Sequence, residues 1–293
     1  MNQNQTGIQS KALHWYPGHM AKTRRLIEEN LKLIDVVVEI IDARIPYSGR
    51  NPYFNEFLKS KPRLIVMNKY DLADEKASAK WAEHFKKKGM TVVPVSCLTG
   101  AGVNKILTEA EKTVADKLER DKEKGRVRTL KMMMVGIPNV GKSSLINRLV
   151  GKASAVTGNK PGVTKGKQWI RLRGNCELLD TPGILPQKFT DEEVAKRLAI
   201  TGAIKDEIIN IELLSYTLIE YLKENYMAEL CARYKITDDI SSLEPYEVLE
   251  VIGKKRGFVI SGGEVDTERA AKTLIDEYRA CKIGKITLEL PRE

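Results

Sequence analysis

The sequence predicts an α/β protein in which a mostly parallel sheet flanked by helices is followed by a smaller, all-helical domain. Three observations lead to this prediction. Runs of apolar and β-branched residues alternate with helical segments over residues 35–120, which is the pattern of a parallel sheet covered by helices. A glycine-rich turn at residues 136–143 joins another such run to a helix. After Pro186, the segments all have helical composition.

The elements of the first half follow one another in a regular order. Residues 22–32 have the amphipathic pattern of a basic helix. Buried strands are predicted at 35–42, 63–68 and 91–96, and helices between and after them at 74–88 and 102–120. The basic run 120–131 is interpreted as a solvated helix end and linker.

The second half begins with a strand at 131–135, the glycine-rich turn and a helix at 143–150. Strands 168–173 and 176–180 are separated by Gly174-Asn175, a pair that suits a hairpin. Thr190 and Glu193 form a capping box that predicts a helix start. Further helices are predicted at 207–226, 227–235, 241–253 and 266–281. We therefore place one domain at 1–185 and a helical domain at 186–293.

Composition excludes several classes of protein. The 293 residues are 42% hydrophobic and 30% charged, enough for a sizeable core and unlike a disordered chain. No apolar stretch reaches the roughly 18–20 residues that span a bilayer, and the polar N-terminus lacks a signal-peptide pattern. The four cysteines are far apart and form no CxxC pair, so neither a zinc ribbon nor a disulfide scaffold is expected. A soluble protein of a reducing cytoplasm is predicted.

The net charge of +10 is unevenly distributed. Residues 1–185 carry 33 Lys and Arg against 18 Asp and Glu, whereas residues 186–293 carry 16 against 21. The basic first part favours a polyanionic partner such as nucleic acid, although a basic soluble protein without such a partner is the open alternative. In the acidic second part, an RNA contact would need a local cluster such as Lys254-Lys255-Arg256.

Residues 136–143 read Gly-Ile-Pro-Asn-Val-Gly-Lys-Ser and fit the phosphate-binding P-loop pattern without a mismatch. Backbone N–H groups of such a loop surround phosphate oxygens, and the helix dipole assists them. Lys142 is predicted to reach the β- and γ-phosphates, and the Ser143 hydroxyl to bind Mg²⁺. The loop residues predicted to contact the nucleotide are Asn139, Val140, Gly141, Lys142, Ser143 and Ser144.

Two later segments fit the same site. Asp180-Thr-Pro-Gly183 ends a predicted strand and matches D-x-x-G. Its aspartate would hold Mg²⁺ through water, and its glycine N–H would contact the γ-phosphate. Thr164 lies in a loop between this motif and the P-loop. It is the predicted second hydroxyl on Mg²⁺ and would sense the γ-phosphate.

The stretch Asn68-Lys69-Tyr-Asp71 matches N-K-x-D, the guanine-reading motif of GTPases. The Asp71 carboxylate could accept hydrogen bonds from guanine N1–H and the exocyclic amine, a donor pair that adenine lacks. Asn68 would contact the base edge and bridge to the P-loop, while the Lys69 stem would lie along the ring. Ser96-Cys97-Leu98 stands where the S-A-K loop would offer a backbone N–H to guanine O6. Together these motifs predict GTP as the substrate.

The order of the motifs is unusual. Ordinary GTPases run from P-loop through switch threonine and D-x-x-G to N-K-x-D and S-A-K. Here N-K-x-D at 68–71 and the S-A-K-like loop at 96–98 precede the P-loop at 136–143. The domain 1–185 is therefore predicted to be a circularly permuted P-loop GTPase domain. The segment leaving D-x-x-G continues directly into the helical domain, which would couple a nucleotide switch to that domain.

The motifs Trp15-Tyr-Pro-Gly-His-Met-Ala-Lys22 and Asp42-Ala-Arg-Ile-Pro46, the permuted order and the helical tail resemble the ribosome biogenesis GTPase A (RbgA, YlqF) family. The resemblance covers nearly the whole chain, with Tyr16 in place of the family's phenylalanine. It implies a GTPase that acts late in assembly of the bacterial large ribosomal subunit. It also implies an ANTAR-like, RNA-binding fold for residues 186–293. We expect no membrane association and a monomer.

Catalysis needs a group that orients the attacking water. Ras-like enzymes place glutamine directly after D-x-x-G, but this chain has Ile184 there. The resemblance nominates His19 for this role, whereas a structural role for His19 is the alternative. Asn139 resembles the asparagine that binds K⁺ in potassium-activated GTPases, where the ion supplies positive charge beside the phosphates.

Three functions are compatible with the sequence. The first is a GTP hydrolase of low intrinsic activity that binds the nascent large subunit and leaves on hydrolysis. The second is an RNA-binding assembly placeholder that uses GTP mainly as a structural ligand. The third is a translation or signalling GTPase with a protein partner, which the basic charge and the permuted architecture disfavour.

Overall fold

A computed structural model describes residues 17–126, 128–151, 168–185, 191–206 and 210–291. These residues form two compact units. Residues 17–185 and 289–291 belong to the first unit, and residues 191–288 to the second. The chain therefore leaves the first unit after residue 185 and returns to it for its last described residues.

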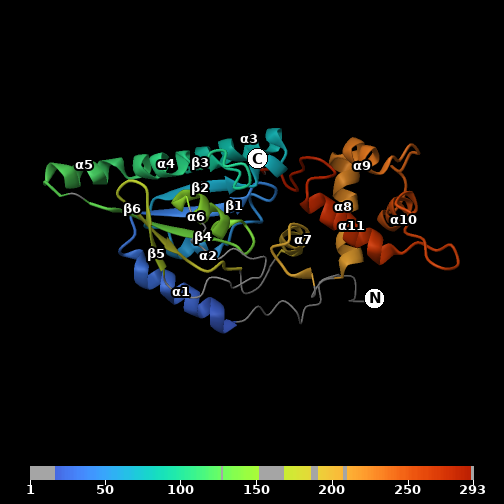
Figure 1. Cartoon of the computed structure of the whole chain (residues 1–293), viewed down its shortest axis with the longest axis horizontal. Coiled ribbons are helices and arrows are strands. Elements are labelled where there is room, and N and C mark those ends of the chain that lie inside the picture. The colour runs from blue at the N-terminus through green and yellow to red at the C-terminus, as the bar shows by residue number, and fades with distance from the viewer. Residues whose placement is uncertain (1–16, 127, 152–167, 186–190, 207–209, 292–293) are drawn as a thin grey trace. The chain divides into compact units, whose positions relative to one another are not determined.

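The first unit is built on a six-stranded sheet (Figure 1). The strands are β1 (Val36–Asp42), β2 (Arg63–Asn68), β3 (Thr91–Pro94), β4 (Leu130–Gly136), β5 (Gln168–Leu172) and β6 (Cys176–Asp180). Their order in the sheet is β3-β2-β1-β4-β6-β5. All neighbours pair in parallel except β5, which pairs antiparallel with β6. The predicted α/β architecture and the hairpin are confirmed.

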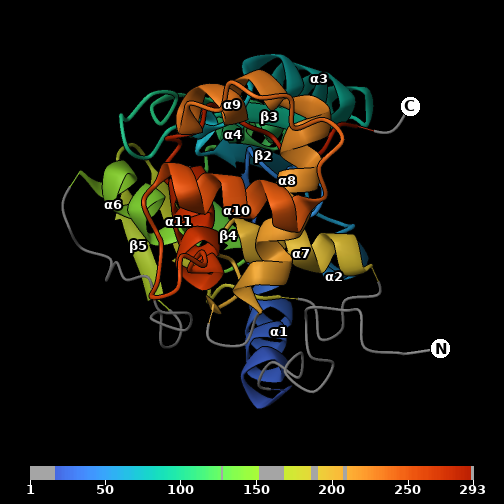
Figure 2. The same ribbon diagram turned by 90° about the vertical axis from the view of Figure 1, so that its right-hand side faces the viewer.

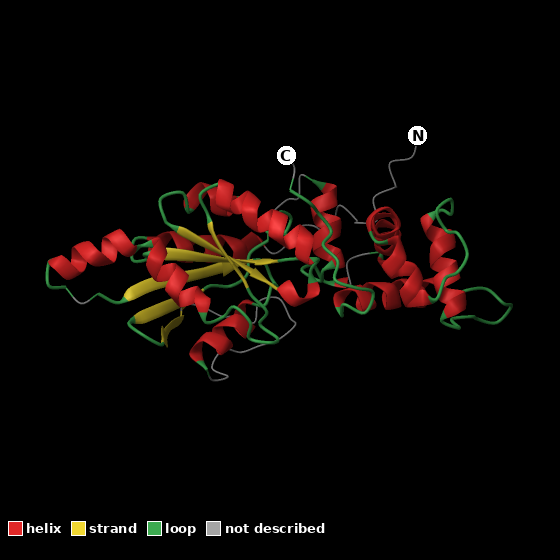
Figure 3. Ribbon diagram, turned by 90° about the horizontal axis from the view of Figure 1, so that it is seen from above, coloured by secondary structure: helices red, strands yellow, loops and turns green. Residues whose placement is uncertain are grey.

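Helices lie on both faces of this sheet (Figure 3). They are α1 (Pro17–Leu31), α2 (Tyr53–Phe57), α3 (Glu75–Lys87), α4 (Lys105–Thr113), α5 (Ala115–Glu123) and α6 (Lys142–Val150), with the short 3-10 helix η1 (Tyr70–Leu72). Strand β1 needs this cover because all seven of its residues are buried. On one side, Trp81 and Phe85 of α3 pack against Ile41, Ile65 and Met67.

Some boundaries differ from the sequence prediction. The segment 102–120 is not one helix, because the backbone leaves the helical conformation at Val114 and separates α4 from α5. Helix α5 buries none of its side chains and ends at Glu123, which agrees with the predicted solvated helix end at the start of the run 120–131. Helix α2 gave no signal in the sequence, since five residues are too few to show a helical period.

The second unit is helical, as predicted (Figure 2). Its helices are α7 (Glu192–Ile200), α8 (Ile211–Asn225), α9 (Met227–Tyr234), α10 (Pro245–Lys255) and α11 (Thr267–Arg279). Helices α8, α10 and α11 pack against one another. The N-cap of α7 is Asp191, whose carboxylate accepts from the backbone N–H of Glu193 at 2.9 Å. The predicted cap, Thr190, lies outside the described residues.

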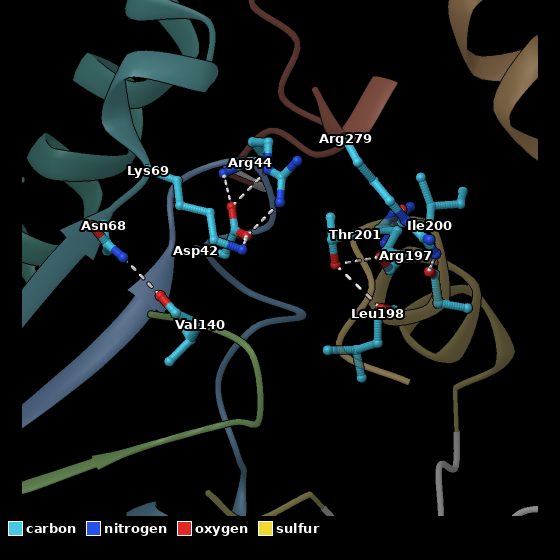
Figure 4. Close-up of polar contacts among 11 residues, drawn as sticks. Asp42, Arg44, Asn68, Lys69, Val140, Arg197, Leu198, Ile200, Thr201 and Arg279 are labelled. Atoms are coloured by element: carbon cyan, nitrogen blue, oxygen red, sulfur yellow. Dashed lines mark hydrogen bonds and ion pairs between the residues drawn. The ribbon is translucent and has the colours of Figure 1, made fainter. Parts of the chain in front are cut away.

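Arg279 at the end of α11 closes the last turn of α7 (Figure 4). Its guanidinium donates to the carbonyl oxygens of Ile200 at 2.9 Å and Ala199 at 2.8 Å. Helix C-termini leave such carbonyls without partners within the helix, and a cation there also complements the dipole. This contact joins the first and last helices of the unit.

The expected RNA-binding cluster 254–256 is only partly available for an external partner. Arg256 donates to the carboxylate of Glu277 at 2.6 Å and lies over the ring of Tyr234. Burial alone would raise the pKa of Glu277, but hydrogen bonds from Arg233 and Tyr234 and the charge of Arg256 lower that pKa to about 2. Arg256 is thus part of an ion-pair network with Glu277 and Arg233, which leaves Lys254 and Lys255 as the exposed members of the cluster.

The end of the chain binds to the first unit through Glu289. Its carboxylate accepts from the backbone N–H groups of Tyr47 and Ser48 and from the Ser48 hydroxyl. Its carbonyl oxygen accepts from Trp81 Nε1 at 2.8 Å. The predicted boundary places residues 186–293 entirely in the second domain. Glu289 instead belongs to the first unit, because it binds hydrogen-bond donors of that unit.

Among the helices of the described ranges, none combines the length and apolar composition needed to cross a bilayer.

Candidate functional site

The predicted motifs meet at one edge of the sheet. Parallel strands end at the same edge, and ligands of open α/β sheets bind outside those carboxyl ends. Asn68 ends β2, Gly136 ends β4 and Asp180 ends β6. Ser96 follows two residues after the end of β3. Motifs that stand in permuted order along the chain are therefore brought together by the strand order.

The P-loop connects β4 to α6 and has the backbone that its glycines require. Gly141 has φ of +95° and is the N-cap of α6, and Asn139 also has a positive φ of 57°. A Cβ on Gly141 would lie only 2.3 Å from Nδ2 of Asn68. Any side chain at this position would therefore displace Asn68. Ser143 is half-buried and Ser144 is exposed in the first turn of α6.

Asn68 joins three predicted motifs (Figure 4). Its Nδ2 donates to the carbonyl oxygen of Val140 in the P-loop at 2.7 Å. Its Oδ1 accepts from the backbone N–H of Cys97 in the S-A-K-like loop at 3.1 Å. The side chain is buried, so both hydrogen bonds are shielded from water. The predicted bridge from Asn68 to the P-loop is confirmed.

Lys69 lies beside a buried ion pair that sequence reasoning did not assign to the site (Figure 4). Its Nζ is 2.9 Å from Oδ2 of Asp42. Arg44 contacts the same carboxylate through Nε at 3.0 Å and Nη2 at 2.8 Å. Burial alone would raise the pKa of Asp42, but Arg44 and Lys69 outweigh it and hold that pKa well below its usual range. The signal in the sequence was a carboxylate at the end of a buried strand, Asp42, followed two residues later by Arg44.

Asp71 and Cys97 are the two residues for which the sequence predicts contacts to a guanine base. Asp71 lies half-buried in η1, and no described residue donates a hydrogen bond to its carboxylate. Ser96 is buried and shapes the neighbouring loop, because its Oγ accepts from the N–H of Thr99 at 3.1 Å. Burial raises the pKa of the Cys97 thiol to about 12. This thiol therefore stays protonated at neutral pH.

Lys142 and Asp180 form a buried ion pair at the phosphate end of the site. Burial lowers the pKa of Lys142, and the Asp180 carboxylate offsets only part of this effect. The described residues contain no cluster of three or more His, Cys, Asp or Glu that could hold a metal. The Ser143 hydroxyl and the Asp180 carboxylate are oxygen donors, the ligand type that Mg²⁺ takes at nucleotide sites together with phosphates and water.

Gly183 and Ile184 run close to the P-loop. A Cβ on Gly183 would lie 2.9 Å from the backbone nitrogen of Pro138, so D-x-x-G approaches the loop backbone directly. The N–H of Ile184 donates to Gly136 at 3.1 Å, and its carbonyl accepts from Asn51 at 3.1 Å. The Ile184 side chain is buried. It has neither the chemistry nor the exposure to orient water.

Two predicted residues are not placed by these observations. Thr164 lies outside the described residues. His19 falls in the first turn of α1, and its side chain also lies outside what is described.

The sheet, the P-loop and the base-reading motifs define a P-loop GTPase with circularly permuted motifs. Comparison with known proteins agrees with this class. Residues 131–235 match the family model described as "50S ribosome-binding GTPase". A ribosome biogenesis GTPase A of Bacillus pumilus is 44% identical over 280 residues, which are 95% of this chain and 99% of that protein. This chain belongs to the ribosome biogenesis GTPase A family.

More distant relatives have the same extent. The ribosome biogenesis GTPase A of Thermotoga maritima is 35% identical over 96% of this chain and 95% of its own length. Mitochondrial ribosome-associated GTPase 1 of Bos taurus is 33% identical over 94% of this chain and 88% of its own length. The crystal structure of GNP-bound YlqF from T. maritima aligns with a TM-score of 0.61 and 30% identity, covering 93% of this chain and 99% of that one.

Proposed function

We propose that this protein is a GTP hydrolase that binds the assembling large ribosomal subunit, promotes a late maturation step and is released on hydrolysis. The observation that carries the proposal is the convergence on one sheet edge of P-loop, N-K-x-D, S-A-K-like loop and D-x-x-G, with Asn68 joining three of them. Family membership supports the ribosomal partner, since the relatives are named for ribosome biogenesis.

Each residue of the site has a defined role in this proposal. Asp71 and the backbone at Cys97 read guanine, and Lys142 binds the phosphates together with the P-loop amides. Ser143, Thr164 and Asp180 would hold Mg²⁺, which supplies charge neutralisation for phosphoryl transfer. Asn139 would hold K⁺. His19 would orient water, a role supported by the buried and apolar character of Ile184.

The ribosomal partner would be recognised through rRNA in the cytoplasm by a monomeric protein. The balance of +15 in residues 1–185 supports contact with phosphates. Low turnover without the particle would follow from the absence of a water-orienting group after D-x-x-G.

The test of the proposal is GTP hydrolysis measured with and without purified large subunits, in K⁺ and in Na⁺. We expect slow turnover alone, clear stimulation by the particles, and higher rates in K⁺. Particle binding without stimulation would instead favour an assembly placeholder that uses GTP as a structural ligand. Stimulation by a protein factor and not by particles would favour a translation or signalling GTPase.

A second prediction concerns the helical unit. Arg256 is held by Glu277. Lys254 and Lys255 are both exposed at the end of α10, and Lys254 makes only an exposed ion pair of 3.7 Å with Glu250, so these two lysines are the members of the cluster that we propose for RNA contact. Replacing both with glutamine is expected to weaken binding to large-subunit particles by about 5- to 20-fold and to reduce the slope of log affinity against log salt by up to about 2. GTP affinity should not change.

The matched control neutralises Lys205 and Lys272, two exposed lysines of the same unit. This variant should bind particles like the unmodified protein. Unchanged particle affinity and salt slope in the Lys254→Gln, Lys255→Gln variant would assign the RNA contact to the first unit alone.

A further inference from the structure

Arg148 connects the helix of the P-loop to the predicted guanine-reading loop. It lies in α6, six residues after Lys142. Its Nε donates to the carbonyl oxygen of Cys97 at 3.0 Å, and its Nη2 donates to that of Leu98 at 2.5 Å. One guanidinium therefore binds two successive peptide groups of a loop that is about fifty residues earlier in the chain.

The loop at 96–102 follows β3, which is an edge strand of the sheet. Its internal hydrogen bonds join Ser96 to Thr99, Gly100 and Ala101, and the N–H of Cys97 donates to Asn68. The carbonyls of Cys97 and Leu98 accept from Arg148. The Leu98 side chain is 76% exposed, so side-chain packing does not hold it. A Cβ on Gly100 would lie 3.2 Å from Arg148 Nη1, which shows how closely the guanidinium follows the backbone.

The chemistry of this contact bears on base recognition. The N–H of Cys97, the predicted contact of guanine O6, donates to Asn68 Oδ1, and the carbonyl of the same residue accepts from Arg148. The charge-assisted hydrogen bonds from Arg148 therefore hold the peptide groups that directly follow this N–H. They fix the orientation of the loop before a ligand binds, which removes part of the ordering cost of binding.

We propose that Arg148 is a positioning residue for guanine: it holds the loop whose backbone N–H would contact guanine O6, and it ties that loop to the helix that begins at the phosphates. The inference rests on the proposed GTP-binding function. It assigns to Arg148 the O6 side of the base and leaves the 2-amino side to Asp71.

The test measures dissociation constants for GDP, IDP and ADP by calorimetry in Mg²⁺. Guanine and hypoxanthine both carry O6, but only guanine has the 2-amino group. Arg148→Ala is therefore expected to weaken GDP and IDP binding by the same factor, about 5- to 30-fold, so that their ratio is unchanged. Arg148→Lys, which keeps the charge but not the two-pronged donor, should recover part of the loss. ADP should stay weak throughout.

Arg171→Ala is the matched control, because this arginine is on β5 with a side chain that is 91% exposed. It should leave both affinities within about twofold of the unmodified protein. The melting temperature of Arg148→Ala should stay within a few degrees, since the residue is exposed. If Arg148→Ala is less stable than this, the dissociation constants of Arg148→Lys for GDP and IDP test the inference in its place.

GDP affinity that is unchanged in Arg148→Ala would overturn the inference. A changed ratio of GDP to IDP would also overturn it, because Arg148 would then act on the 2-amino side. Failure of the unmodified protein to prefer GDP and IDP over ADP would instead contradict the proposed function itself.

Discussion

Asp71→Asn is expected to weaken GTP binding by about 10²- to 10⁴-fold. The carboxylate of Asp71 would accept two hydrogen bonds from guanine, and hydrogen bonds to a charged group contribute about 1.5–3 kcal/mol each. The amide of asparagine can accept only one of them and places its own N–H₂ against the remaining donor. Xanthine carries a carbonyl at that position, so the variant should gain affinity for xanthosine nucleotides. Titration with GDP and XDP measures both effects.

The control for this change is Asp116→Asn, which removes the charge of an exposed aspartate at the start of α5. It should leave the preference for GDP over XDP intact. Equal GTP affinity in Asp71→Asn and in the unmodified protein would show that the N-K-x-D motif does not read the base.

His19→Ala is expected to lower particle-stimulated kcat by about 10²- to 10³-fold, the range for loss of one positioned catalytic group. GTP affinity should stay nearly intact, because our proposal assigns the base, phosphate and magnesium contacts to other residues. Release from the particle would require hydrolysis in our proposal. The variant should therefore accumulate on large-subunit particles, which sedimentation can measure alongside single-turnover GTP cleavage.

His14→Ala is the matched control, since it removes a histidine five residues earlier and should hydrolyse GTP at the normal rate. A normal single-turnover rate in His19→Ala would remove the catalytic role and leave His19 with a structural one. Reduced particle binding in His19→Ala would instead place the residue at the ribosomal contact.

The sequence alone was enough to predict the class of fold and the motifs that the fold brings to one edge of the sheet. Local patterns carried that information. The runs at 35–42 and 63–68 are recognisable as buried strands because apolar and β-branched residues predominate in them. The P-loop is recognisable because its glycines and lysine stand at fixed spacing. The permutation could also be predicted, since it is a matter of motif order. The carboxyl ends of the parallel strands lie at one edge of the sheet, whatever the order of these strands in the sequence.

The tertiary structure alone decided the contacts between residues far apart in the chain. Asp42 is a partner of Lys69, Arg148 binds the loop after β3, Arg256 is held by Glu277, and Glu289 returns to the first unit. None of these pairs has a characteristic spacing. Charged side chains are normally solvated, and whether one is exposed or bound inside depends on which buried partner the fold brings to it. Local patterns thus determined the elements and the motifs of the chain, whereas the partners of its charged side chains depended on which distant segments the fold brought beside them.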